Sequence, residues 1–140
     1  MMPNAQAELY LLPSKIDSLV VIEQLIENIK DHHNIPEDLY GNILVSITEA
    51  VNNAIKHGNK LNPDLNVEFT FENTDTNYSF TVKDEGAGFD FNHIADPTLP
   101  ENVEKPDGRG IFIMKSLADE VEFLMDGRQV NINFRRNLKN

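Results

Sequence analysis

The chain has 140 residues, no cysteine and a formal net charge of -11 at pH 7. This length suits one domain with a single core, and the acidic surplus argues against an extended surface for DNA or RNA phosphates. A bound nucleotide is still compatible with the charge, because backbone amides, a helix N-terminus or a metal ion can hold phosphates locally. The lack of cysteine and of any long apolar segment predicts a cytoplasmic protein without membrane contact.

The start of the chain is predicted to form a strand and a helix. Glu8 to Leu12 has the pattern of a short strand. A helix is then expected from Asp17 or Ser18, either of which could cap it, to about His32. Its apolar residues recur at helical spacing at Leu19, Ile22, Ile26 and Ile29. His32 and the adjacent His33 are expected to interact with the carbonyl groups at its end.

The next segment is a strongly patterned amphipathic helix. Pro36 suits its first turn, and Glu37 and Asp38 favour the positive end of its dipole. Gly58 is expected to cap its C-terminus. One stripe is apolar and should face the core, and it contains Tyr40, Ile43, Leu44, Ile47, Val51, Ala54 and Ile55. The opposite side is polar and contains Ser46, Glu49, Asn53 and Lys56.

A pair of strands and an irregular stretch follow this helix. Leu65 to Glu72 and Asn77 to Lys83 alternate apolar and polar residues, which predicts an antiparallel pair that turns at Asn73 to Thr76. From Phe89 to Asp107 the pattern fails, and three prolines interrupt the chain. Irregular stretches of this length inside a domain are usually functional or mobile.

The last part of the chain adds a helix and two strands. A short helix is expected from Gly110 to about Leu117. Glu120 to Met125 and Gln129 to Arg135 are predicted strands, joined by Asp126-Gly127-Arg128. Strands with helices on one face predict an α+β fold, a two-layer α/β sandwich with a mixed, mostly antiparallel sheet.

The polar side of the long helix offers a candidate site. Glu49 and Asn53 lie one turn apart, so their side chains should point the same way. The Asn53 amide oxygen suits Mg²⁺, which accepts few protein oxygens and takes others from substrate phosphates. Glu49 could orient a water or take the proton of an attacking hydroxyl. Both could also be solvated surface residues, and Asn52 is a rival ligand, although it points about 100° away.

A glycine turn follows the second predicted strand, with the sequence Asp84-Glu85-Gly86-Ala87-Gly88. A buried carboxylate at Asp84 could accept a hydrogen bond from the exocyclic amine of adenine. Gly86 and Gly88 would let the backbone bend and approach the base. Glu85 is expected to face solvent. An ordinary Asp-Gly loop between elements is the alternative.

A second glycine segment, Gly108-Arg109-Gly110, precedes the apolar run Ile111 to Met114. The start of a helix there would offer free amides to a phosphate, and Arg109 or Lys105 could contact the β- or γ-phosphate. Arg109 could equally be a surface charge. The segment lacks the Lys and Ser or Thr of a Walker-type loop, and it does not follow a strand as a dinucleotide fingerprint does.

In this order, three segments resemble the N, G1 and G2 boxes of the GHKL ATP-binding superfamily, which includes gyrase, histidine kinases and a heat-shock chaperone. They are Glu49-Ala50-Val51-Asn52-Asn53-Ala54, Asp84-Glu85-Gly86-Ala87-Gly88 and Gly108-Arg109-Gly110. The ending His57-Gly58 and the run from Asp96-Pro97-Thr98 to Ile111-Phe112 resemble the bacterial anti-sigma factor serine/threonine kinases. The resemblance extends over nearly the whole chain and implies one Bergerat-type ATP-binding domain, residues 1–140.

The resemblance implies a role for each matching residue. Glu49 would be the catalytic base, Asn53 the Mg²⁺ ligand and Asp84 the residue that reads adenine. Further contacts to ATP would come from Asn53, Lys56, His57, Gly86, Gly88, Lys105, Gly108, Arg109, Gly110 and Ile111, with residues 91–107 as the ATP lid. It also implies a homodimer that binds a sigma factor and phosphorylates a serine or threonine of an anti-anti-sigma protein.

One departure from the superfamily pattern is visible. Where the superfamily often has a Gly-Thr pair near its last strands, this chain has Gly127-Arg128-Gln129, so no threonine contacts the base region from there. Two other functions stay open. The chain could be an ATP-sensing, protein-binding regulator with little or no phosphotransfer. A detached catalytic part of a histidine kinase is disfavoured, because no helical segment carries a histidine in a phosphoacceptor hairpin.

Overall fold

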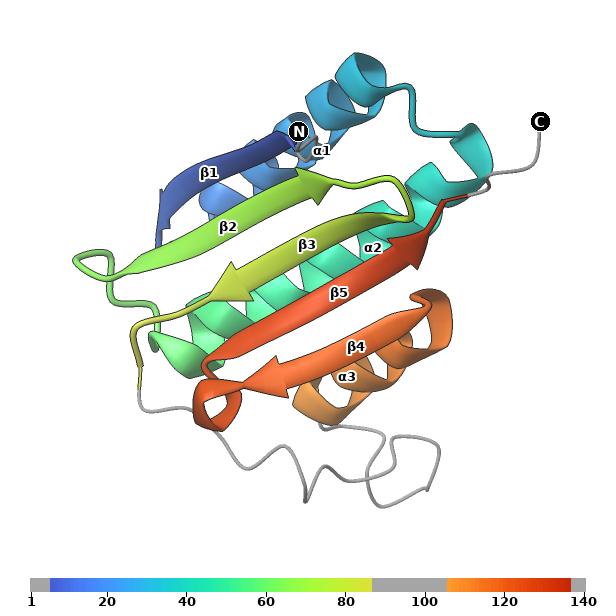
Figure 1. Ribbon diagram of the computed structural model, residues 1–140. Helices are drawn as coiled ribbons and strands as arrows, with labels where there is room; N and C mark the ends of the chain where they lie inside the picture. Colours follow the sequence, from blue (N-terminus) through green and yellow to red (C-terminus); the bar gives the residue numbers. More distant parts are fainter. Residues whose placement is uncertain (1–5, 87–105, 137–140) are drawn as a thin grey trace.

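The computed structural model describes residues 6–86 and 106–136 as two layers, with three α-helices on one face of a five-stranded sheet (Figure 1). The strands are β1 (Gln6–Pro13), β2 (Asn66–Asn73), β3 (Asn77–Lys83), β4 (Glu120–Leu124) and β5 (Gln129–Arg135). The helices are α1 (Ser18–His33), α2 (Glu37–Asn53) and α3 (Pro106–Leu117). The predicted two-layer sandwich is confirmed, although α3 begins at Pro106 and not at Gly110.

The sheet has the strand order β1-β2-β3-β5-β4, and all four pairings are antiparallel. Both predicted hairpins are present. Val82 of β3 lies opposite Phe69 of β2 and opposite Val130 of β5. Because side chains alternate along a strand, this register places the buried residues of the three strands on the face that the helices cover.

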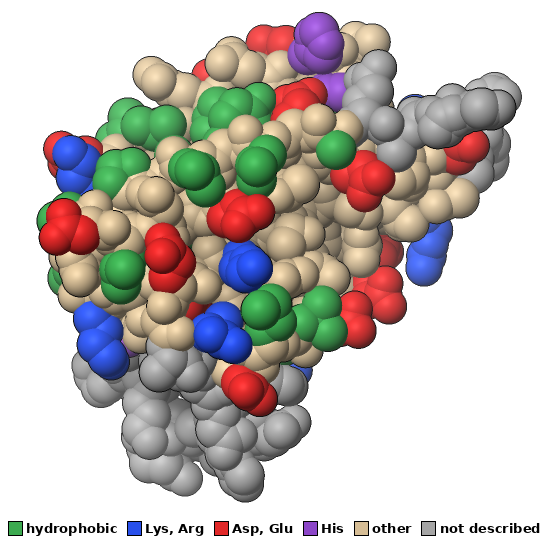
Figure 2. Space-filling model, turned by 60° about the vertical axis from the view of Figure 1, so that its left-hand side comes forward, with side chains coloured by type: hydrophobic (Ala, Val, Ile, Leu, Met, Phe, Trp, Pro, Cys, Tyr) green, Lys and Arg blue, Asp and Glu red, His purple; other side chains and the backbone are tan. Residues whose placement is uncertain are grey.

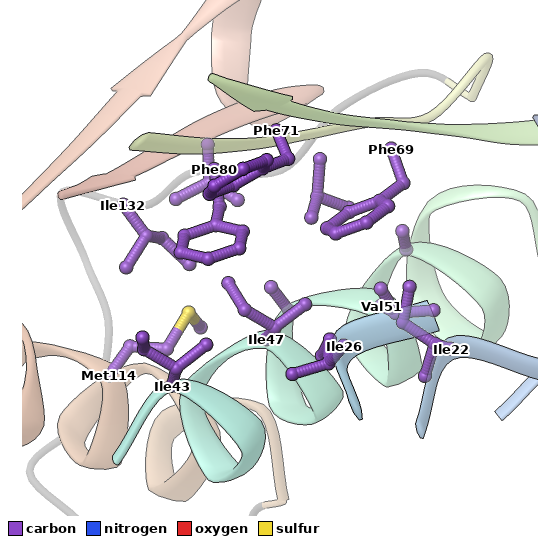
Figure 3. Close-up of a cluster of buried hydrophobic side chains, with 14 of the residues drawn as sticks. Ile22, Ile26, Ile43, Ile47, Val51, Phe69, Phe71, Phe80, Met114 and Ile132 are labelled. Atoms are coloured by element: carbon purple, nitrogen blue, oxygen red, sulfur yellow. The ribbon is translucent and has the colours of Figure 1, made fainter. Parts of the chain in front are cut away.

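The core fills the space between the sheet and the helices. Figure 3 shows side chains of both layers pointing toward one another, among them Phe69, Phe71, Phe80 and Ile132 of the sheet and Ile22, Ile26, Ile43, Ile47, Val51 and Met114 of the helices. The rings of Phe71 and Phe80 lie 5.0 Å apart, and those of Phe80 and Phe134 lie 6.0 Å apart. These aromatic contacts hold the strands that border the candidate site in a fixed position.

The long helix has its predicted apolar face but not its predicted cap. After Asn53 the helix continues as a π-helical turn, Ala54–Gly58, and the Asn59 N–H donates to the Ala54 carbonyl at 2.8 Å. The left-handed residues that end it are Lys60 (φ 54°) and Leu61 (φ 59°). The prediction that Gly58 caps the helix is therefore wrong, and contacts at the site explain its small size.

Both ends of α1 also differ from the prediction. Asp17 makes no side-chain capping hydrogen bond. The buried Ser18 hydroxyl donates instead to the carbonyl of the last β1 residue at 2.7 Å. At the other end, the His33 ring donates to Glu8 Oε2 at 2.8 Å and accepts the Asn73 side-chain N–H at 3.1 Å. These bonds join α1 to β1 and β2, whereas His33 was expected to interact with the carbonyls at the helix end.

The surface in Figure 2 carries acidic, basic and hydrophobic side chains side by side, and its basic side chains form no continuous strip. With the net charge of -11, this face does not offer an extended path for a phosphate backbone. Within the described residues, none of the helices combines the length and the apolar character needed to cross a bilayer.

The polar side of α2 is partly covered, because α3 packs against it. Ser46, which was predicted on the polar side, is 0% exposed. Its hydroxyl has no hydrogen-bond partner among the described residues. A buried hydroxyl without a partner costs free energy, since it loses its bonds to water on folding.

Replacing Ser46 with alanine should therefore raise the free energy of unfolding by about 1 kcal/mol. Ser18→Ala is the matched control, because Ser18 is also buried in a helix but its hydroxyl is bonded to β1. That control should lower the free energy of unfolding by about 1 kcal/mol. Urea denaturation measures both variants, and equal destabilisation by the two substitutions would contradict the assignment.

Candidate active site

A pocket opens between the end of α2 with its π-helical turn, the middle of α3, the end of β3 and the start of β5. About 450 Å³ of unoccupied space, open solvent included, lies between its walls. Its walls are largely apolar and include Ala50, Ala54, Val82, Ile111, Met114, Phe123 and Val130. Its polar side chains are Asn53, His57, Asp84 and Arg128. Apolar walls with a few polar groups are typical of sites for small ligands with a flat, weakly polar body.

Asp84 is the buried carboxylate of this pocket, with 6% of its surface exposed. Its N–H donates to the Arg128 carbonyl at 2.8 Å, which holds it beside β5. Its Oδ1 accepts the Gly86 N–H at 2.8 Å, as in a tight Asp-Gly turn. Burial raises the pKa of Asp84, and the Gly86 N–H and the Arg128 charge oppose that rise. The group can therefore accept a hydrogen bond from a ligand inside an apolar pocket.

Two glycines allow the backbone to approach this carboxylate closely. A Cβ at Gly58 would lie 2.3 Å from Asp84 Oδ2. A Cβ at Gly86 would lie 1.8 Å from the Gly58 carbonyl oxygen. Neither distance is possible between non-bonded atoms, so only glycine fits at these positions. The glycine of the predicted adenine turn is thus needed for its contact with the end of the long helix.

Asn59 fixes this arrangement, and the sequence analysis did not identify it. It is 2% exposed, and its side-chain oxygen accepts the Glu85 N–H at 2.8 Å. Its side-chain nitrogen donates to the Ser14 hydroxyl at 2.8 Å and to the Asn66 carbonyl at 3.1 Å. One amide therefore joins the ends of α2, β1 and β3 to the start of β2. Its position directly after the matched His57-Gly58 ending was the only signal in the sequence.

Glu49 and Asn53 meet at Gly110 of α3. A Cβ at Gly110 would lie 2.7 Å from Glu49 Oε1, 3.4 Å from Asn53 Nδ2 and 3.7 Å from Asn53 Oδ1. The two predicted residues thus lie together at the border between α2 and α3, with Asn53 also lining the pocket. The Asn53 amide oxygen is a hard donor of the kind Mg²⁺ accepts, so this side chain fits the ion. No cluster of three or more His, Asp or Glu side chains suited to a metal occurs in the described part of the chain.

Only some of the remaining predicted site residues line the pocket. His57 and Ile111 line the pocket, whereas Lys56 is exposed and does not. Gly108 is buried and Arg109 is exposed, and both lie near the start of α3. Because α3 begins earlier than predicted, Gly108 and Arg109 also lie in the helix, and Gly110 is not its first residue. Gly88, Lys105 and residues 91–105 of the predicted lid lie outside the described residues.

The turn between β4 and β5 adds residues that the sequence analysis did not assign to a site. Gly127 and Arg128 line the pocket. Met125, Asp126 and Gly127 all have positive φ angles, of 54°, 57° and 87°. A hairpin was predicted here, but no local pattern shows that its turn folds toward residues far earlier in the chain.

The comparison with known families identifies the class of domain to which this fold belongs. Residues 12–134 match the family described as histidine kinase-like ATPase domain, and the chain belongs to this family. Its GHKL character, predicted from three motifs, is thereby confirmed.

Among curated proteins, the chain is similar to several named Serine-protein kinase RsbW. The one from Staphylococcus epidermidis is 26% identical over 117 residues, which cover 79% of this chain and 74% of that protein. The one from Bacillus cereus is 22% identical over 122 residues, which cover 82% of this chain and 75% of that protein. The one from Staphylococcus aureus is 31% identical over 84 residues, which cover 55% of this chain and 53% of that protein.

Gly86→Ala should lower the free energy of unfolding by about 2 kcal/mol, because its methyl group would meet the Gly58 backbone, which has no free rotamer to move away. Gly41→Ala in α2 is the control, since a Cβ there meets nothing within 4 Å. It should raise the free energy of unfolding by about 0.5 kcal/mol through helix propensity. Urea denaturation measures both variants. An unchanged free energy of unfolding in Gly86→Ala would contradict the close approach of the Gly58 and Gly86 backbones.

Asp84→Asn should raise the melting temperature at neutral pH. Because the folded-state pKa of Asp84 is raised, the native state binds more protons than the unfolded state between the ordinary pKa and the raised one. Stability is then lost as pH rises through that window, and it stays lost at neutral pH. Thermal unfolding is measured from acid to neutral pH. The melting temperature of Asp84→Asn should exceed that of the wild type only above the ordinary carboxyl pKa. A constant difference at every pH would contradict this assignment.

Proposed function

We propose that this chain is an ATP-dependent serine/threonine protein kinase that acts as an anti-sigma factor. The observation that carries the proposal is the meeting of Glu49 and Asn53 at Gly110, beside an apolar pocket that contains the buried Asp84 carboxylate. Membership of an ATPase domain family supports ATP as the ligand. The names of the similar curated proteins support phosphotransfer to serine.

Adenine would occupy the apolar part of the pocket. Ala54, Ile111 and Met114 offer surfaces to the faces of the base. The ionised Asp84 carboxylate accepts a hydrogen bond from the exocyclic amine. Gly86 and Gly88 are proposed to shape the backbone around it, and His57 lies at the pocket wall.

The phosphates would lie toward the start of α3. Free amides in the first turn of a helix bind phosphate, and here that turn includes Gly108 and Arg109. Lys105, Arg109 and Lys56 are the cations proposed to contact the phosphates, and residues 91–107 are proposed to close over them as a lid. Asn53 would hold Mg²⁺, which when bound neutralises phosphate charge and keeps the γ-phosphate in line for attack.

Glu49 is the proposed catalytic base. Its carboxylate accepts the proton of a serine or threonine hydroxyl of the partner, and the hydroxyl oxygen forms a bond to the γ-phosphorus. The bond from that phosphorus to the β–γ bridging oxygen breaks, and ADP leaves. Gly110 leaves room for the carboxylate to take this position, because a side chain there would displace it.

The proposed partners are proteins. By resemblance to the anti-sigma factor kinases, the chain would form a homodimer in the cytoplasm, bind a sigma factor and phosphorylate an anti-anti-sigma protein. The net charge of -11 is compatible with protein partners that present a basic face, and it would speed their encounter. No direct contact with nucleic acid is part of the proposal.

Glu49→Gln should lower the rate of phosphotransfer by about 100-fold or more, because the amide cannot accept the proton. Nucleotide binding should persist, since Asp84 and the apolar walls are unchanged. Transfer of labelled γ-phosphate from ATP to a candidate anti-anti-sigma protein measures the first effect. Thermal shifts with Mg-ATP, Mg-ADP and Mg-GTP measure the second, because a ligand of the native state raises the melting temperature.

Gly41→Ala serves as the control, since it changes α2 away from the pocket. Wild-type protein that is stabilised by adenine nucleotides but transfers no label to a bound partner would contradict the kinase and favour a nucleotide-sensing binding regulator. Absence of stabilisation by any adenine nucleotide would contradict ATP binding itself.

A further inference from the structure

Arg128 is bonded to Asp84 through its main chain, and its side chain is bonded within its own turn. Its carbonyl accepts the Asp84 N–H at 2.8 Å. Its Nε donates to the Met125 carbonyl at 3.1 Å, so the guanidinium is held along the turn between β4 and β5. Both Arg128 and Asp84 line the pocket. Arg128 therefore has a fixed place at the wall of the pocket that contains the buried carboxylate.

The turn that carries Arg128 has an unusual backbone. Met125, Asp126 and Gly127 are three successive residues with positive φ, and two of them are not glycine. Such conformations cost free energy in residues with a side chain, and they persist where the surrounding structure imposes them. Here they bring Gly127 and Arg128 to the pocket wall.

We propose that Arg128 is a specificity-determining residue that acts through Asp84 and makes the pocket select purines with a 6-amino group over purines with a 6-oxo group. The inference rests on the proposed binding of ATP, and it assigns a role to a residue that stands where related domains often have threonine.

The selection follows from the hydrogen-bonding capacity of the carboxyl group. An ionised Asp84 only accepts hydrogen bonds, so it pairs with a 6-amino group and repels a 6-oxo group. A protonated Asp84 also donates, and it can pair with a 6-oxo group. Selectivity is therefore lost when Asp84 binds a proton. Burial favours that protonation and the Arg128 charge opposes it.

Few other charges lie near Asp84 in the described part of the chain. Glu85 follows it directly, but the Glu85 carboxylate accepts the Asn66 N–H at 2.6 Å, away from the pocket. His57 lines the pocket from the π-helical turn. The other lining residues from α3, β3 and β5 are apolar. Among the described lining residues, Arg128 is the cation that keeps its charge at every pH of interest.

The test compares Arg128→Gln with Arg128→Lys, which keeps the charge. The ¹³C carboxyl resonance of Asp84 in the free protein is identified by its loss in Asp84→Asn, and its titration midpoint is then measured. We expect Arg128→Gln to move the midpoint to higher pH and Arg128→Lys to return it toward the wild-type value. Arg128→Met, which keeps the alkyl stem, replaces the glutamine variant if the latter does not give a folded amide spectrum.

The second readout is the ratio of dissociation constants for inosine triphosphate and ATP across the same pH range. Arg128→Gln should lose its preference for ATP at a higher pH than the wild type does, whereas the lysine variant should keep it. An unchanged Asp84 midpoint in Arg128→Gln and Arg128→Met would overturn the proposal. A shifted Asp84 midpoint with an unchanged ratio of dissociation constants would also overturn it.

The two readouts separate this inference from the proposed function. Wild-type protein that binds neither nucleotide contradicts ATP binding, and the failure then appears before any variant is compared. If the wild-type protein binds and prefers ATP and the Arg128 variants behave as the wild type does, only the role of Arg128 is contradicted. His57 is present in every variant, so a difference between the variants is assigned to the change at position 128.

Discussion

The close approach of two backbone segments, at the end of the long helix and after β3, is the constraint on which the candidate site depends. Gly86 lies against the Gly58 carbonyl and Gly58 lies against the Asp84 carboxylate, so neither position has room for a side chain. Asn59 maintains the approach by bonding to Glu85, Ser14 and the start of β2. The Asp84 carboxylate is thereby held in a buried position, in close contact with the Gly58 backbone at the pocket wall. Without that contact, the helix and the sheet would still form two layers, but the carboxylate would have no fixed place.

The contrast between local and distant causes explains what the sequence could predict. The long helix and the β2–β3 pair have strong periodicity, so their position and their buried faces followed from the pattern of Ile47, Val51 and Phe80. Glu49, Asn53 and Asp84 were found because their types and order resemble a known family. Asn59 and Arg128 act through contacts with segments far away in the chain, and no local pattern reports such contacts. The π-helical turn was missed for the same reason, since its geometry serves the packing of Gly58 on Asp84.

The residues that break local rules gather around the pocket. A carboxylate is buried among apolar side chains, a turn adopts successive left-handed conformations, and a helix widens into a π-turn. Each feature is unfavourable by itself, and each is imposed by neighbours that are well packed or fully hydrogen-bonded. The sheet and the cluster of phenylalanines supply the stability that these features cost. Such a division between a regular scaffold and an irregular site is expected where geometry serves binding and not folding.

The order of the strands has a consequence for biosynthesis. Of the described strands, β5 is the last to be translated, yet it lies between β3 and β4. While a ribosome is still completing the chain, β1, β2 and β3 can pair, but β4 has no neighbour to join and one side of β3 stays open. A nascent chain that pauses before residue 129 therefore exposes a strand edge of the kind that promotes aggregation. A ligand of the pocket cannot stabilise such an intermediate, because the wall that carries Arg128 and Val130 is the last part of the pocket to be made.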